Sequence, residues 1–161
     1  MFLSGMLAWG RTRVKTNSLS PLVRGAHWLP AAAWMGGIFY LSQQSAPLDA
    51  TGLSQQSAPL GATASAAWST VAHLGLYMGL ALLLFWALAR NAGPRTPGWV
   101  LAAVAFALTV LYGVSDELHQ TFVPGRTASE ADLGLDAAGA TMGVTLALLW
   151  DKFLTARHLR R

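Results

Sequence analysis

Apolar stretches and polar segments alternate along this chain. Four apolar stretches cover about residues 25–42, 66–89, 98–122 and 130–150. The first holds 18 residues without a Lys, Arg, Asp or Glu. As a helix it would reach about 27 Å, close to the thickness of the hydrocarbon layer of a bilayer. The pattern predicts an all-α integral membrane protein, a four-helix bundle over 25–152 between a basic leader (1–24) and a basic tail (153–161).

Composition supports the membrane assignment. Hydrophobic residues make up 53% of the chain and charged residues 11%. Soluble domains carry about a quarter charged residues, so this chain has too few to cover a surface that faces water. The chain has no cysteine, which excludes disulfides, thiolate catalysis and Cys-ligated metal sites. Its basic residues gather at the termini and in one short loop, which indicates membrane orientation and not nucleic-acid binding.

The positions of Lys and Arg predict how the helices are oriented. Cations flank the N-terminus, the turn over 90–95 and the C-terminus, whereas the segment over 42–69 has none and the segment over 115–132 has only Arg126. Cytoplasmic loops are enriched in Lys and Arg. We therefore expect both termini to be cytoplasmic and the segment over 115–132 to lie on the extracytoplasmic side of the cytoplasmic membrane.

A 12-residue repeat lengthens the segment between the first two helices, because Leu41 to Leu48 (LSQQSAPL) recurs as Leu53 to Leu60. Two polar, proline-containing copies are typical of a lengthened loop and not of a solenoid, which needs more repeats. We expect the duplicated loop over 42–64 to be mobile and dispensable.

Polar chemistry concentrates between the third and fourth helices, where five of the seven acidic residues lie between Asp116 and Asp136. Charges between membrane-length segments are costly to place, so they indicate a functional site; an interhelical network of salt bridges is the alternative. Residues three or four apart share a helix face, which groups His119 and Gln120 with Asp116. The candidate ligand-binding residues are His73, Tyr77, Asp116, Glu117, His119, Gln120, Arg126, Asp132 and Asp136.

Arg126 is the only cation among these acidic residues. Several carboxylates at a low-dielectric boundary need a counter-charge. We therefore expect Arg126 to pair with Glu117 and Asp132.

Small residues and a capping signal predict how the helices pack and begin. Ser129 with Asp132, or Thr127 with Glu130, offers a capping box at the start of the fourth helix. Glycines four apart allow close contact between helices. The predicted helix-packing residues are Gly75 and Gly79 in the second helix and Gly139 and Gly143 in the fourth.

Together these motifs resemble the VanZ-like family, small polytopic bacterial membrane proteins named for a teicoplanin-resistance protein. The resemblance covers about residues 28–150. Tyr40-Leu41-Ser42 resembles the exit from the family's first helix, and His73 with Tyr77 resembles its His-x-x-x-Tyr. The family's Glu-x-x-Gln, Pro-Gly-Arg, Asp and paired glycines are matched by Glu117, Gln120, Pro124, Gly125, Arg126, Asp132, Gly139 and Gly143.

Two positions depart from the family's pattern. Ser69-Thr70 stand where the family often has Asp-Lys, and Asp136 stands where it often has Asn. The resemblance implies a bacterial cell-envelope protein related to glycopeptide (teicoplanin) resistance, and it implies no catalytic mechanism.

Three kinds of function fit these residues. An enzyme acting on a membrane-linked envelope molecule could use Glu117, His119 and Asp132 as catalytic groups. A binding protein could engage a lipid-linked envelope precursor or a glycopeptide, and a structural subunit could use the polar residues to hold helices against a membrane-protein partner. We expect no cofactor and no metal, because the histidines and carboxylates form no compact ligand motif. Whether catalysis occurs stays open.

Overall fold

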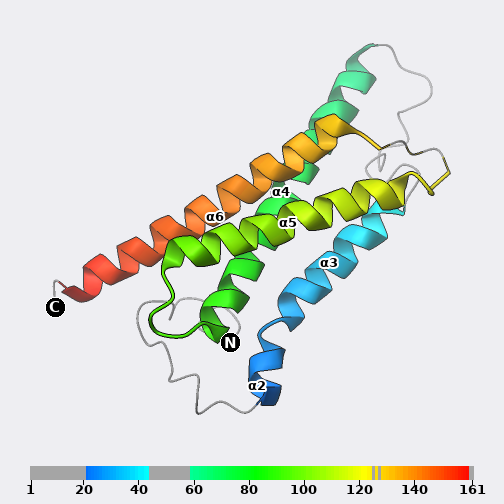
Figure 1. The fold of residues 1–161 in the computed structure, drawn as a ribbon. Helices are drawn as coiled ribbons and strands as arrows, with labels where there is room; N and C mark the ends of the chain where they lie inside the picture. The colour runs from blue at the N-terminus through cyan, green and yellow to red at the C-terminus, as the bar shows by residue number, and fades with distance from the viewer. Residues whose placement is uncertain (1–20, 44–58, 125, 127, 160–161) are drawn as a thin grey trace.

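The computed structural model describes residues 21–43, 59–124, 126 and 128–159, and the side chains of 59–66 and 154–159 are not described. Throughout these residues the regular structure is α-helical (Figure 1), so the predicted all-α class is confirmed. The helices are α2 (Pro21–Ala26), α3 (Leu29–Ser42), α4 (Pro59–Asn91), α5 (Gly98–Gln120) and α6 (Glu130–Leu159).

Among the described residues, three helices are long and apolar enough to cross a membrane: α4 over Ala67–Asn91, α5 over Gly98–Gln120 and α6 over Glu130–Phe153. The predicted first span over 25–42 is not one helix. The chain turns at His27 and Trp28, and α3 then has 14 residues, or about 21 Å of helix. Pro30 accounts for the break, because proline has no N–H for the Ala26 carbonyl and its ring would clash with it.

Two other helix boundaries differ from the prediction. Helix α4 begins at Pro59 and not at residue 66, so it includes the end of the second copy of the repeat, and α6 continues to Leu159 through most of the predicted tail. Residues 44–58, which hold most of the repeat, lie outside the described residues, as do residues 1–20 of the leader. The expectation that the duplicated loop is dispensable stays a prediction.

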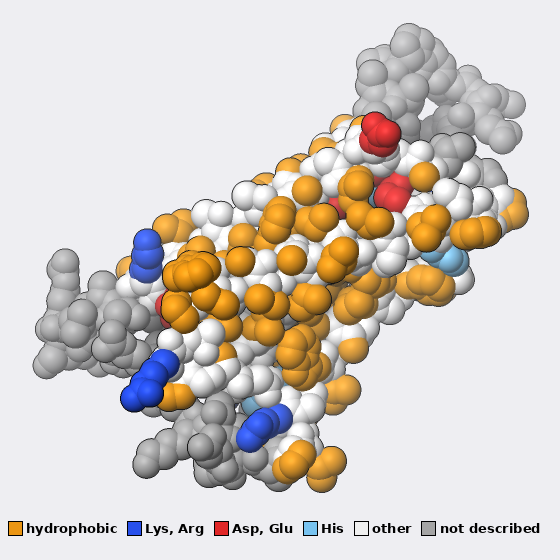
Figure 2. Space-filling model, viewed as in Figure 1, with side chains coloured by type: hydrophobic (Ala, Val, Ile, Leu, Met, Phe, Trp, Pro, Cys, Tyr) orange, Lys and Arg blue, Asp and Glu red, His pale blue; other side chains and the backbone are white. Residues whose placement is uncertain are grey.

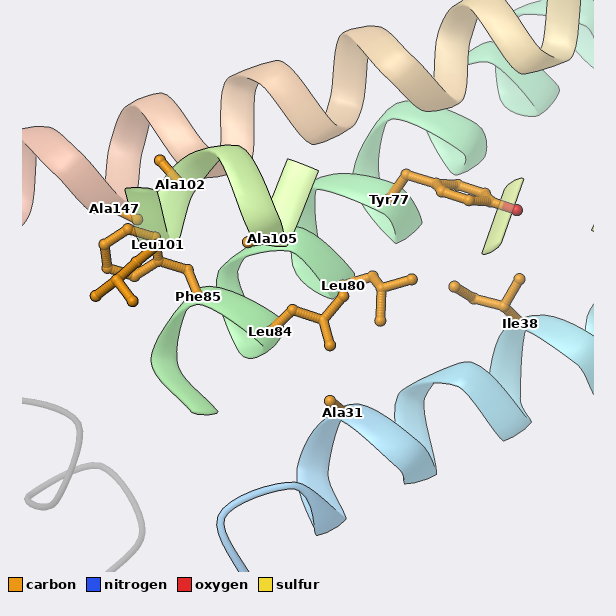
Figure 3. Packing of buried hydrophobic residues seen from close by; sticks show 10 residues of the cluster. All are labelled: Ala31, Ile38, Tyr77, Leu80, Leu84, Phe85, Leu101, Ala102, Ala105 and Ala147. Carbon is orange, nitrogen blue, oxygen red and sulfur yellow. The ribbon is translucent and has the colours of Figure 1, made fainter. Parts of the chain in front are cut away.

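The helices α4, α5 and α6 pack against one another, and α3 packs against α4 and α5 (Figure 1). Between them lies an apolar cluster that includes Ile38, Leu80, Phe85 and Leu101, and Tyr77 lies at one end of it (Figure 3). Successive long helices run in opposite directions, so the exit of α3, the start of α6 and the end of α5 meet at one end of the molecule.

Glycines allow α4 and α6 to approach closely. A Cβ at Gly139 would lie 2.5 Å from the Leu74 carbonyl oxygen, and one at Gly143 would lie 2.6 Å from the Met78 carbonyl oxygen. Gly79 gives room to the Trp34 ring of α3, whose Cζ2 would lie 2.8 Å from an added Cβ. The prediction for Gly75 is wrong, because an added Cβ there would meet nothing within 4 Å.

Helix α3 is attached to its neighbours by side-chain hydrogen bonds as well as by packing. Trp34 Nε1 donates to the Leu76 carbonyl of α4 at 2.8 Å. From α5, the Tyr112 hydroxyl donates to the Met35 carbonyl at 2.6 Å. Apolar contact alone favours helix association weakly in lipid. These bonds therefore help to fix how α3 sits on the three long helices.

Charged side chains separate towards the two ends of the molecule, with an apolar band between them (Figure 2). One end of the molecule holds the starts of α3 and α5 and the ends of α4 and α6, and it carries four cations: Arg24, Arg90, Arg95 and Lys152. The acidic residues of α5 and the first turns of α6 belong to the other end, as does Arg126.

Candidate functional site

Asp116 joins three helices through one oxygen atom. Its Oδ2 accepts hydrogen bonds from Ser42 Oγ of α3 at 2.7 Å, Tyr77 Oη of α4 at 3.3 Å and Gln120 Nε2 of α5 at 3.1 Å. The residue is only 4% exposed. Its Oδ1 is buried and has no hydrogen-bond partner among the described residues. The donor groups of Ser42, Tyr77 and Gln120 are thus directed towards Asp116.

Asp136 joins α6 to α4 through a histidine. Its Oδ1 lies 2.7 Å from His73 Nδ1, and the carboxyl group is fully buried. When Asp136 is ionised its carboxylate can only accept, so Nδ1 then carries the proton; the ring's other nitrogen, Nε2, is left for another partner. Gly113 of α5 makes this possible, because a Cβ there would lie 3.1 Å from Asp136 Oδ2. This pair involves the residue that departs from the family's usual Asn.

Glu117 fixes the start of α6. Its Oε2 accepts the backbone N–H of Ser129 at 2.7 Å, while Ser129 Oγ accepts the backbone N–H of Asp132 at 3.2 Å. The second contact is the N-cap half of the predicted Ser129–Asp132 capping box. The first comes from α5 instead of from the Asp132 side chain. Glu117 therefore connects the end of α5 to the helix that follows.

A cavity of about 370 Å³ opens at this end, between α3, α4 and the last turns of α5. Its polar lining includes His73, Asp116 and Arg126, whereas its apolar lining comes from α3 and α4 and includes Trp34 and Leu76. Trp34 is 40% exposed and the neighbouring Val71 is 59% exposed. The cavity therefore joins a polar end to an apolar wall on the outer flank of the helices.

The structure divides the predicted site residues into two groups. Five of them line the cavity: His73, Tyr77, Asp116, Gln120 and Arg126. The other four lie outside the lining: Glu117, His119, Asp132 and Asp136. His119 instead stacks on Phe39, with ring centroids 4.4 Å apart. Glu117 and Asp136 act from outside the lining, because Glu117 binds the Ser129 backbone and Asp136 binds the His73 ring.

The predicted pairing of Arg126 is wrong. No ion pair joins its guanidinium to Glu117, Asp132 or another described carboxylate, and Arg126 Nε is buried without a described partner. Glu117 finds the Ser129 backbone instead. The ion pair within the described helices is His73–Asp136. Carboxylates can therefore be accommodated here by histidine, hydroxyl, amide and backbone donors, without the arginine.

Sequence reasoning missed three residues. Ser42 reaches Asp116, Gly113 makes room for Asp136, and Trp34 both anchors α3 and lines the cavity. In the sequence, Ser42 stands at the exit of the first helix, and its polar side chain at the end of an apolar helix is the available signal. Gly113 and Trp34 gave no comparable signal, because their importance depends on neighbours from other helices.

The described residues contain no group of three or more His, Asp or Glu placed to hold a metal ion. What they do form is a buried hydrogen-bonded network beside an open cavity. This network, with three long apolar helices, defines a multi-pass helical membrane protein that carries a polar site at one end.

The sequence model of the VanZ/LLP1 family matches residues 27–151, most of the chain. The protein belongs to the VanZ/LLP1 family. No curated protein and no solved structure matches it significantly.

Proposed function

We propose that this VanZ/LLP1 protein binds an amphipathic, lipid-linked molecule of the cell envelope at the extracytoplasmic face of the bacterial cytoplasmic membrane. In this proposal the binding contributes to glycopeptide (teicoplanin) resistance, as the name-giving protein of the VanZ-like family suggests. The cavity is the observation that carries the proposal, because it places Arg126 and His73 next to an apolar wall of α3 and α4.

The arrangement of polar and apolar residues in this lining matches a molecule with a polar head and a hydrocarbon chain. Ligand sites combine mostly apolar walls with a few placed polar groups. The partly exposed Trp34 and Val71 mark the side on which a chain could enter from the bilayer. Glu117 and Asp132 do not line the cavity, so the proposal is one of binding and assigns no catalytic role to them or to His119.

The binding proposal predicts that the protein purified in mild detergent retains an envelope lipid or lipid-linked precursor. Mass spectrometry of the co-purified lipids would identify it. Trp34→Ala should reduce the retained amount, because it removes the apolar wall and the bond to Leu76. Trp99→Ala, at an exposed tryptophan of α5 outside the cavity lining, is the matched control and should retain the wild-type amount. Equal retention by both variants would contradict the proposal.

The proposed orientation rests on the cations. Arg24, Arg90, Arg95 and Lys152 gather at one end, and cytoplasmic segments are enriched in such residues. Reporters fused after Arg161 or within 90–95 should therefore be cytoplasmic, and one placed within 41–60 should be external. An external reporter after Arg161 would contradict this orientation and place the cavity on the cytoplasmic side.

A structural role is the second candidate, and a specific observation favours it. Three donors from three helices converge on Asp116, and Asp136 binds His73 across α4 and α6. Such a network would hold the helices of an accessory subunit in place without any ligand. In that case no lipid would be retained specifically, while substitutions in the network would still lower stability.

A further inference from the structure

The polar groups that line the cavity differ in how far the protein itself satisfies them. Ser42, Tyr77 and Gln120 donate to Asp116, and His73 Nδ1 is bonded to Asp136. The lining atoms without a described hydrogen-bond partner include Arg126 Nε and Asp116 Oδ1, both of which are buried. No described group bonds His73 Nε2 either, since the described bond of this ring is made by Nδ1. A ligand in the cavity therefore meets a permanent cation and a nitrogen that can either donate or accept.

From these two groups we propose that the ligand's polar end is a phosphate monoester carried on a hydrocarbon chain. This inference rests on the proposed binding function and specifies its ligand class. Arg126 fits the phosphate because a guanidinium presents two parallel N–H donors to its oxygens. The apolar wall of α3 and α4, with Trp34 and Leu76, takes the first part of the chain.

His73 distinguishes a monoester from a diester. A phosphate monoester loses its second proton near neutral pH, so one proton can be shared between the phosphate and an imidazole in either direction. A phosphodiester has no such proton and offers acceptor atoms only. Asp136 acts here as a positioning residue: it holds Nδ1 and thereby fixes the ring, so that Nε2 is the atom offered to the cavity.

The carboxylates in and around the lining argue against a ligand with a cationic head group. Asp116 is the carboxylate in the cavity lining, and one of its oxygens already accepts three hydrogen bonds while the other is buried. Asp136 and Glu117 lie outside the lining. An ammonium group would therefore find little accessible negative charge, whereas an anion would find Arg126.

The test uses the full chain reconstituted in phosphatidylcholine nanodiscs that contain a minor fraction of phosphatidic acid or an equal fraction of phosphatidylglycerol. Both lipids are anionic, but phosphatidic acid is a monoester and phosphatidylglycerol a diester. Native mass spectrometry would measure how much of each stays bound. We expect phosphatidic acid to be preferred by roughly 10-fold or more, the range expected for one hydrogen bond to a charged group.

Substitutions distinguish the role of Arg126 in binding the phosphate from the role of His73 in selecting a monoester. Arg126→Gln should lose retention of both anionic lipids, whereas Arg95→Gln, at the opposite end of the molecule, should match the wild type. The double variant His73→Gln with Asp136→Asn replaces the ion pair with two neutral amides that can still bond, so it should fold and retain phosphatidylglycerol but lose the preference for phosphatidic acid. A thermal melt of each variant would verify folding.

The possible results of this experiment separate the phosphate-monoester assignment from the proposed lipid binding. Retention of no lipid above the phosphatidylcholine background would overturn both. Equal retention of phosphatidic acid and phosphatidylglycerol would overturn the monoester assignment and leave lipid binding in place. Displacement of phosphatidic acid by inorganic phosphate at equal concentration would show that the site recognises phosphate without the chain, which would also overturn the assignment. A preference for phosphatidic acid that the double variant keeps would remove His73 from the recognition.

Discussion

His73→Leu is expected to lower the free energy of unfolding by roughly 3–5 kcal/mol, the loss typical when one partner of a buried ion pair is removed. His73 Nδ1 lies 2.7 Å from a carboxyl group that is fully buried. Leucine would leave Asp136 between α4 and α6 without the donor that offsets its burial. Thermal or denaturant unfolding in detergent, followed by circular dichroism, would measure the loss.

A double-mutant cycle tests whether the loss comes from the pair. Adding Asp136→Asn to His73→Leu removes the unpaired charge and should restore much of the stability. His27→Leu is the matched control, because the ring contact of His27 is with Trp86 and not with a carboxylate; it should cost clearly less. If the second change restores nothing, the His73–Asp136 contact does not govern stability.

Gly139→Ala is expected to have the next largest effect, a loss of about 1–3 kcal/mol from overpacking. The added Cβ would lie 2.5 Å from the carbonyl oxygen of Leu74 and 3.1 Å from its Cα. Backbone atoms cannot rotate away as a flexible side chain can, so α4 and α6 would have to separate. The shift would also move Asp136, one turn earlier in α6, away from His73.

Gly134→Ala provides the control on the same helix, because an added Cβ there meets nothing within 4 Å. It should be neutral or slightly stabilising, since alanine favours helix more than glycine does. Melting temperatures in one detergent would compare the two variants. Equal melting temperatures would contradict the close approach of α4 and α6 at Gly139.

The candidate site was predictable as a set of residues but not as a set of contacts. Charges are rare in this chain, so Asp116, Glu117 and Asp136 were conspicuous within apolar surroundings, and spacing placed His73 with Tyr77. The partner of each carboxylate was not predictable in this way. Arg126 was the obvious counter-charge by sign, yet Asp136 meets His73 and Glu117 meets the Ser129 backbone. Which donor reaches a carboxylate depends on the orientation of each helix about its own axis. The spacing of residues along one helix does not determine that orientation.

The all-α class, the three long apolar helices, a capped start of the fourth helix and the close-packing glycines at 139 and 143 were predictable from the sequence alone, although two residues, Thr127 and Ser129, were equally good candidates for the cap. Each of these follows from local physical chemistry: the length of an apolar stretch, a side chain that can cap a helix, or the absence of a Cβ. Three features became clear from the packing of the helices. Helix α3 is short and is held by Trp34 and Tyr112. Gly75 borders the cavity whereas Gly79 packs against Trp34, and Arg126 lines the cavity without a described ion-pair partner. These features depend on which atoms of distant segments come within a few ångströms of one another, and that follows from packing of the whole bundle.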